Sequence, residues 1–298
     1  MEIPLDVEVD NKQAKQIMKA LSMPIGRQPM HKKTVSKAFS HMTDSTVSSS
    51  MTDRYAEEPV ALTWGEGCEI TYEHTKIFEK CNKYEKDKQK IHFDWIASNY
   101  EGMYTRMGYP DPEKVAKFVH KIAKKNEIKP EDAKIIDFGC GTGLIGKHLA
   151  KSGYKKIVGL DISPNMLEEC SSSGVYSELH EHEIGEDPNN LPCSMRNQFD
   201  FCVCTGLINN NYMDYLLFEE MLLSVKKGGY VVFAARYSFM GKYWYDKIIK
   251  EMHENGRWKL VATDTHFKYD KLECVSIGRF SKTPSKVYVF QKTQEELN

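Results

Sequence analysis

The sequence has no apolar run of the length that a membrane-spanning helix needs, which is about 20 residues. It also lacks the pattern of a signal or transit peptide, because its start, Met1–Asp10, is acidic. Basic and acidic residues nearly cancel, at 41 and 42. We therefore expect a cytoplasmic protein that does not bind a membrane, and the charge balance does not indicate nucleic acid as a partner.

Paired zinc-ligand spacing is missing from the eight cysteines, and the chain is not a small secreted scaffold. Cys202 and Cys204 lie in a predicted strand, which indicates buried, reduced thiols. His180 and His182 alternate without a Cys or a third spaced ligand. We expect no metal site, and a solvated loop is an equal interpretation of the acidic stretch 178–184.

The domain organisation follows from composition. Residues 28–58 are rich in Ser, Thr, Lys and Met without a lasting hydrophobic period, so most of 1–60 is predicted to be a disordered extension. Residues 11–21 can form a short helix that docks on a protein partner. Residues 61–90 carry aromatics and are expected to be partly ordered. The remainder, 91–298, is large enough for one domain with a single core.

The most informative stretch is Ile135–Gly143, with the sequence IIDFGCGTG. Its two β-branched residues predict a buried strand, and its three alternate glycines let the backbone turn sharply and approach a ligand. Residues 144–151 are predicted to be a helix whose N-terminal amides face the same ligand. A tight turn without any ligand is the structural alternative.

The glycine spacing separates two classes of ligand. Dinucleotide folds use G-x-G-x-x-G, with a pyrophosphate at the helix N-terminus. Here the spacing is G-x-G-x-G after Asp137, which would repel a pyrophosphate but can accept hydrogen bonds from an ammonium group. Asp161 ends a second predicted strand, 156–161, where an acid can bind a ribose diol. The pattern favours an amino-acid-like ligand over NAD.

These segments resemble the class I S-adenosylmethionine-dependent methyltransferases, over residues 91–292. The resemblance implies an α/β, Rossmann-like seven-stranded sheet, mostly parallel with its last strand antiparallel, and helices on both faces. It also implies S-adenosyl-L-methionine as the cofactor, with its methionine part at the glycine loop, its ribose at Asp161, and its adenine near Ile162, Met166 and Glu183. The expected cofactor-binding residues are Tyr100, Asp137, Gly139, Cys140, Gly141, Gly143, Asp161, Ile162, Met166, Glu183 and Thr205.

Other predicted elements follow the order of that family. Phe93–Glu101 resembles its first helix, which caps the pocket with Tyr100, although Glu101 replaces the usual Asp. Short matches, including Gly108–Pro110 and Gly256–Trp258, most resemble the methyltransferase-like proteins associated with the Williams-Beuren syndrome chromosomal region. The remaining predictions are helices at 112–125, 212–225 and 242–255, a third strand that closes near Ile184, a turn at 226–229, and strands at 199–206, 230–235, 258–263 and 286–291.

The methyl acceptor is not specified by the sequence. The tip of the fourth strand, Thr205–Tyr212, lacks the Pro-Pro pair of amino-methyltransferases, so methylation of bases or glutamine is not supported. We expect a small-molecule or protein acceptor and predict no catalytic residue, because displacement at a sulfonium needs no strong base. A silent binding subunit is the alternative, and the intact Asp137, glycines and Asp161 weigh against it. Candidate acceptor-side residues are Tyr104, Asn209, Tyr212 and Arg236. Tyr237 and His266 are further candidates.

Overall fold

The structure is a computed structural model that describes residues 86–208, 216–237, 240, 245–272 and 282–294. These residues belong to one compact unit, Tyr55–Glu296. The extension predicted to be disordered, 1–60, lies outside the described residues. The same holds for residues 61–85, and for Asn209 and Tyr212 on the acceptor side.

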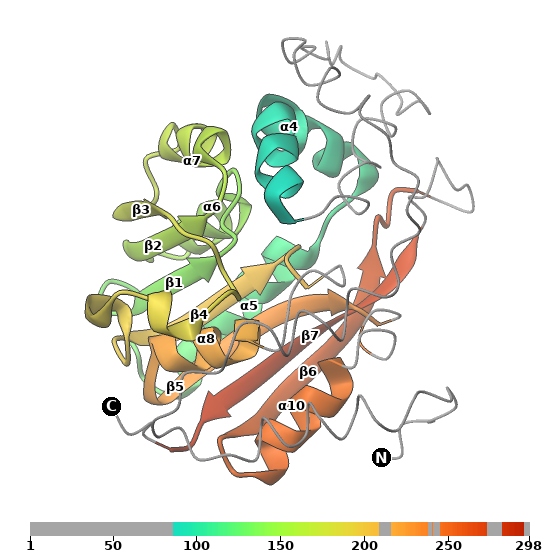
Figure 1. The fold of residues 1–298 in the computed structure, drawn as a ribbon. Helices are drawn as coiled ribbons and strands as arrows, with labels where there is room; N and C mark the ends of the chain where they lie inside the picture. The colour runs from blue at the N-terminus through green and yellow to red at the C-terminus, as the bar shows by residue number, and fades with distance from the viewer. Residues whose placement is uncertain (1–85, 209–215, 238–239, 241–244, 273–281, 295–298) are drawn as a thin grey trace, which may run out of the picture. The chain divides into compact units, whose positions relative to one another are not determined.

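Within the described residues, seven strands form one sheet in the order β3-β2-β1-β4-β5-β7-β6 (Figure 1). The pairs among β1 to β5 are parallel, whereas β7 is antiparallel to β5 and to β6. The predicted sheet is therefore confirmed. Its strands are β1 Lys134–Phe138, β2 Lys156–Asp161, β3 Glu178–Glu181, β4 Phe199–Thr205, β5 Val225–Arg236, β6 Trp258–Lys268 and β7 Thr283–Lys292.

Helices cover both faces of the sheet because successive strand residues point to opposite sides. Ile135 of β1 packs in the cluster that contains α5 and α6, and Ile136 packs in the cluster that contains α8 and α10. Each of these helices buries one apolar stripe, as Val115 and Val119 do in α5. The four helices are α5 Asp111–Lys125, α6 Leu144–Ala150, α8 Leu216–Ser224 and α10 Tyr245–Glu254 (Figure 1).

A third apolar cluster joins helices α4, Lys86–Met107, and α7, Pro164–Ser171. Met103 of α4 and Met166 of α7 both belong to it, and Figure 1 shows the two helices side by side. Because α7 begins just after the carboxyl end of β2, this cluster places α4 beside the end of the sheet where the glycine loop lies. Two short 3-10 helices, Pro188–Asn190 and Cys193–Met195, precede β4.

Several predicted boundaries are wrong. The last two strands are longer than predicted, since β6 runs to Lys268 and not only to 263, and β7 begins at Thr283 and not at 286. The third strand was expected to reach Ile184, but β3 ends at Glu181. Residues 226–229 were expected to be a turn between helix and strand, but they belong to β5 as an irregularity, since Phe199 pairs with Val225 and Phe201 with Tyr230. Lys226 in this irregular segment forms an ion pair with Asp200 of β4.

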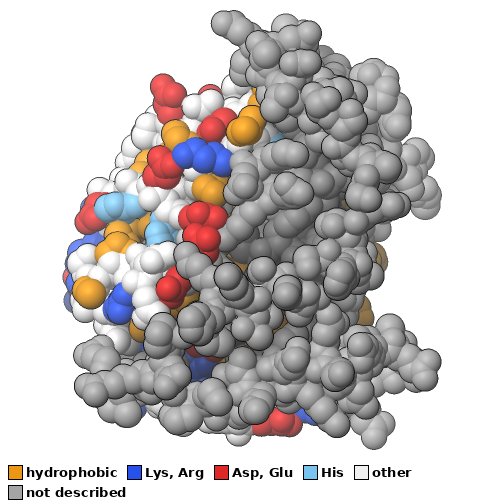
Figure 2. Space-filling view, viewed as in Figure 1, with side chains coloured by type: hydrophobic (Ala, Val, Ile, Leu, Met, Phe, Trp, Pro, Cys, Tyr) orange, Lys and Arg blue, Asp and Glu red, His pale blue; other side chains and the backbone are white. Residues whose placement is uncertain are grey.

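Charged side chains of both signs lie on the coloured part of the face drawn in Figure 2. Over the coloured part of that view, acidic, basic and histidine side chains are interspersed, as the balanced composition leads us to expect. No helix in the ranges that the structure describes is long and apolar enough to cross a membrane.

A substitution at Phe233 of β5 tests the packing of the core, because the Phe233 ring packs against Phe218, Tyr288 and Phe290. We expect Phe233→Ala to lower the free energy of unfolding by about 3–5 kcal/mol, since a buried ring is replaced by a cavity. Phe267→Ala removes a ring from a residue that is 50% exposed, and should cost less than about 1 kcal/mol. Urea denaturation measures both, and equal losses would contradict this description of the core.

Candidate functional site

The glycine loop follows β1 and is held against β2. The amides of Gly139 and Cys140 both donate to the carbonyl oxygen of Leu160, at 2.8 and 2.9 Å. Gly139, Gly141 and Gly143 have φ angles of 69°, 53° and 88°. These values lie in the left-handed region, which L side chains rarely adopt, so glycine is favoured at all three positions.

The glycines of this loop differ in what surrounds them. A Cβ atom on Gly139 would lie 1.9 Å from Cδ1 of Leu207, so the Leu207 side chain would have to move to admit a side chain there. A Cβ atom on Gly141 would meet nothing within 4 Å. Gly141 therefore leaves its backbone open on the side where a ligand can approach.

Tyr176 holds the glycine loop in place, and this residue was not among the predicted site residues. Its hydroxyl donates to Oδ2 of Asp137 at 2.7 Å and accepts from the amide of Gly146 at 3.0 Å. Its ring fills the space beside Gly143, Gly146 and Gly159, where an added Cβ would come within 3.1 Å of ring atoms. Tyr176 thus connects β1, α6 and β2 through one side chain.

Asp137 is completely buried. Burial raises the pKa of its carboxyl to about 7, the charge of Asp161 adds to the rise, and the Tyr176 hydrogen bond opposes it. Its Oδ1 atom has no hydrogen-bond partner among the described residues. A positive ligand group near the loop would stabilise the charged form of this carboxyl.

Asp161 ends β2 and binds the glycine loop. Its Oδ2 accepts from the amide of Gly141 at 2.8 Å, and its Oδ1 accepts from the amide of Ser163 at 2.9 Å. Burial raises its pKa to about 6, although these backbone amides lower it. Each carboxylate oxygen retains a second acceptor site, so Asp161 can still bind a hydroxyl group.

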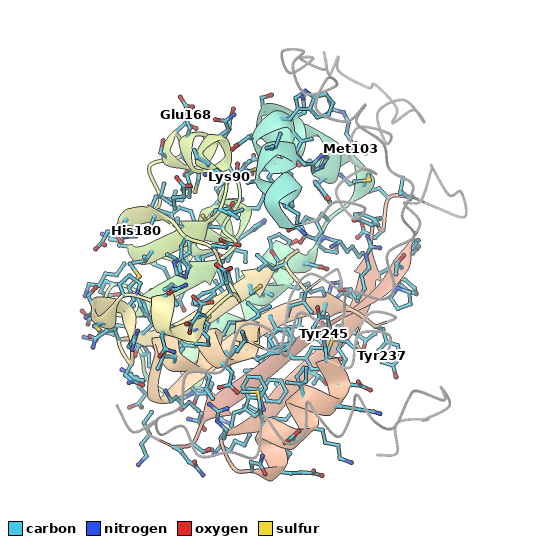
Figure 3. All side chains as sticks on the ribbon, in the orientation of Figure 1. Lys90, Met103, Glu168, His180, Tyr237 and Tyr245 are labelled. Atoms are coloured by element: carbon cyan, nitrogen blue, oxygen red, sulfur yellow. The ribbon has the colours of Figure 1, made fainter. Side chains whose placement is uncertain are left out.

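Hydrogen bonds and ion pairs attach α4 to this end of the sheet. Oδ1 of Asp94 accepts from Oγ of Ser163 at 2.6 Å and from the amide of Asn165 at 3.2 Å. The same Ser163 hydroxyl caps α7 by accepting from the amide of Met166. Two ion pairs complete the attachment, Glu101 with Lys147 of α6 and Lys90 with Glu181 of β3, of which Lys90 is labelled in Figure 3.

A cavity lies between α4, the glycine loop and the tip of β4. Eight of the predicted cofactor-binding residues line it: Tyr100, Gly139, Gly141, Asp161, Ile162, Met166, Glu183 and Thr205. The other three, Asp137, Cys140 and Gly143, are buried within or beneath the loop. Six further residues line the cavity and were not among the predicted cofactor-binding residues: Gln89, Phe93, His182, Ile184, Gly206 and Leu207.

His182 lines the cavity and is held by a buried carboxylate. Its Nε2 atom bonds Oε1 of Glu220 in α8, and Oε2 of Glu220 accepts from the amide of Gly185 at 2.7 Å. Glu220 is completely buried. No group of His, Cys, Asp or Glu in the described ranges could hold a metal ion.

Four candidate acceptor-side residues are described by the structure: Tyr104, Arg236, Tyr237 and His266. The ring of Tyr104 lies 4.4 Å from that of Tyr100, and Arg236 donates to the hydroxyl of Tyr269 at 2.8 Å. Tyr237, which is labelled in Figure 3, follows Arg236 and is 52% exposed. His266 contacts Asp111 rather than the cavity lining.

Removing the Tyr176 hydroxyl tests its role in the loop. We expect Tyr176→Phe to lower the free energy of unfolding by about 1–3 kcal/mol, because the Gly146 amide and the Asp137 carboxyl each lose a partner. Tyr154→Phe is the matched control, since the Tyr154 hydroxyl is buried and has no hydrogen-bond partner within the described part. Its removal should be neutral or stabilising. Denaturant unfolding compares the two, and equal effects would contradict the assignment.

The raised pKa of Asp137 predicts a pH dependence of stability. Between pH 3.8, its ordinary pKa, and about 7, the folded chain retains a proton that the unfolded chain has lost. Stability therefore falls as pH rises through this window, by up to about 1.4 kcal/mol per pH unit, and levels off above it. Asp137→Asn lacks this titration, so wild type should lose stability relative to the variant from pH 5 to 7. A difference that stays constant with pH would contradict this.

Comparison with known proteins agrees with this geometry. Residues 135–229 match the model of a family described as a methyltransferase domain. Human methyltransferase-like protein 27 is 28% identical over 179 residues, which cover 58% of this chain and 70% of that protein. An uncharacterized methyltransferase of Emericella nidulans is 30% identical over 126 residues, which cover 36% of this chain and 43% of that protein.

Solved structures are also similar to the chain. An S-adenosylmethionine-dependent methyltransferase from Clostridium acetobutylicum aligns with a TM-score of 0.47 and 16% identity, over 66% of this chain and 98% of that one. The strand order gives the chain a Rossmann-like seven-stranded sheet, and residues 135–229 within it match a methyltransferase domain.

Proposed function

We propose that this protein transfers a methyl group from S-adenosylmethionine to an acceptor that enters beside Tyr100 and Tyr104. The observation that carries the proposal is the cavity itself. Segments distant in sequence, the glycine loop, Asp161, the start of α7 and the tip of β4, line one space. A fold retained only for packing has no need to leave these groups around a shared opening.

The residues present fit the cofactor. Gly141 leaves room where a side chain would intrude, and Asp161 places carboxylate oxygens at the lining. Below the loop, Oδ1 of Asp137 has no hydrogen-bond partner among the described residues, and an ammonium group would stabilise the charged form of this carboxyl. Ile162 and Met166 add apolar surface for a flat base. The proposed roles are thus methionine binding at the loop, ribose binding at Asp161 and adenine binding at Ile162, Met166 and Glu183.

The chemistry requires alignment more than acid–base help. When bound, the cofactor supplies an activated methyl group on a sulfonium. The chain's part is to orient the acceptor and exclude water, and α4 places Phe93 and Tyr100 in the cavity wall for that purpose. We assign no catalytic base. The acceptor is a small molecule or a protein side chain. The 28% identity to human methyltransferase-like protein 27 supports a relationship to the methyltransferase-like proteins associated with the Williams-Beuren syndrome chromosomal region.

Cofactor binding can be tested with two glycines of the same kind. Gly141 and Gly174 both have positive φ, at 53° and 64°, and an added Cβ meets nothing within 4 Å at either. Alanine at each should therefore cost similar stability, about 1–2 kcal/mol. Only Gly141→Ala places a methyl group in the cavity, so only this variant should lose affinity for S-adenosylmethionine, by about tenfold or more. Calorimetric titration measures both.

The same titration separates the proposal from its alternatives. No binding of S-adenosylmethionine by wild type would overturn it and favour a methyltransferase fold that serves as a binding subunit. Equal affinity in Gly141→Ala and Gly174→Ala would show that the cofactor lies elsewhere. Binding of NADH in place of S-adenosylmethionine would favour a dehydrogenase.

A further inference from the structure

A histidine and a buried carboxylate meet at one wall of the cavity. His182 lines the cavity, and its Nε2 atom bonds Oε1 of Glu220 in α8. The other oxygen of Glu220, Oε2, accepts from the amide of Gly185 at 2.7 Å. Glu220 is completely buried, so both of its oxygens bond protein groups instead of water.

The hydrogen bonds of Glu220 determine which nitrogen of His182 carries the imidazole proton. A glutamate at neutral pH is ionised, and a carboxylate can only accept hydrogen bonds. Nε2 of His182 therefore carries the proton and donates it to Glu220. In a neutral imidazole the other nitrogen, Nδ1, then has a lone pair and can only accept.

Nδ1 of His182 is available to a ligand. No described residue bonds this atom, and it does not belong to the buried polar atoms that lack a partner within the described ranges. Nδ1 is therefore accessible, on a side chain that is 12% exposed and forms part of the cavity wall.

His182 lies next to the carboxylate that is proposed to bind the ribose. It directly follows β3, and its backbone amide donates to the carbonyl oxygen of Asp161 at 2.9 Å. The base of a nucleoside is attached to the ribose, so a ribose at Asp161 brings the base to the neighbouring part of the wall. That part contains Ile162, Met166 and His182.

We propose that Nδ1 of His182 accepts a hydrogen bond from the exocyclic amino group of the cofactor's adenine, and that Glu220 is the positioning residue that fixes this tautomer. The inference rests on the proposed function. An adenine amino group has two N–H donors, whereas hypoxanthine, the base of inosine, has a carbonyl oxygen at the same position. A lone pair on Nδ1 therefore favours adenine and disfavours hypoxanthine.

The substitution Glu220→Gln is expected to reverse this preference. The Gly185 amide can only donate, so the single side-chain oxygen of the glutamine must face it. The glutamine NH2 group then faces Nε2 of His182 and donates to it. The imidazole proton moves to Nδ1, which becomes a donor and favours the carbonyl oxygen of hypoxanthine.

The test compares S-adenosylhomocysteine with S-inosylhomocysteine, which carry adenine and hypoxanthine on the same ribose. Calorimetric titration of the full chain at about pH 8, where an ordinary imidazole is neutral, gives the ratio of the two dissociation constants. We expect wild type to bind the adenosyl compound at least about tenfold more tightly, and Glu220→Gln to lower this ratio by about tenfold or more. A loss of packing would weaken both ligands alike, so an unchanged ratio in Glu220→Gln would overturn the inference.

The matched control is Glu219→Gln, the same change at the neighbouring position of α8. Glu219 pairs with Arg257, and neither of these residues lines the cavity. This variant should keep the wild-type ratio. An equal fall of the ratio in Glu219→Gln and Glu220→Gln would contradict the role of Glu220.

Nitrogen NMR with isotope-labelled histidine measures the tautomer directly, because a protonated and an unprotonated ring nitrogen differ in chemical shift. The signals of His182 are those that disappear in His182→Gln. We expect the proton on Nε2 in wild type and on Nδ1 in Glu220→Gln. A wild-type proton on Nδ1, or protons on both nitrogens, would overturn the inference even if Glu220→Gln does not fold.

Failure of the inference is distinguishable from failure of the proposed function. The NMR measurement needs no ligand, so it judges the effect of Glu220 on His182 by itself. If S-adenosylhomocysteine does not bind, the proposed function fails and the inference fails with it. If it binds to wild type with no preference over the inosyl compound, the inference alone is overturned.

Discussion

The hydrogen bonds of the Tyr176 hydroxyl are the constraint on which the site depends. One oxygen joins the carboxyl of Asp137 to the amide of Gly146, and thereby joins the end of β1 to the first turns of α6. The ring below this oxygen explains why Gly143, Gly146 and Gly159 have no side chains, since each would collide with the ring or its neighbours. The Tyr176 side chain therefore affects the conformation of the glycine loop, the position of α6 and the charge of Asp137.

Much of the fold could be predicted because its signals are local. The bounds of β2 follow from a short apolar run that ends in an acid, and the start of α7 follows from a serine cap and a proline. The glycine loop and Asp161 identified one end of the cavity for the same reason. The limits of β3 and the irregular 226–229 segment depend on tertiary contacts, so local patterns did not predict them.

The missed parts of the site are contacts between residues far apart in the chain. Tyr176 lies 39 positions from Asp137, and Glu220 lies 38 positions from His182. A tyrosine before a short strand, or a glutamate in an apolar helix, carries no sign of such a partner in the sequence. The attachment of α4 is similar, because Asp94 was read as part of a helix pattern and the structure shows its bonds to Ser163 and Asn165.

The hydrogen bonds of Glu220 determine how His182 is placed in the cavity wall. Glu220 belongs to the helix that follows the tip of β4, while its partners His182 and Gly185 lie in the segment beside the cavity. A buried carboxylate released from either partner would lose a hydrogen bond that water cannot replace, so these bonds hold the segment against the helix. His182 therefore reaches the cavity wall from a position that its bond to α8 determines.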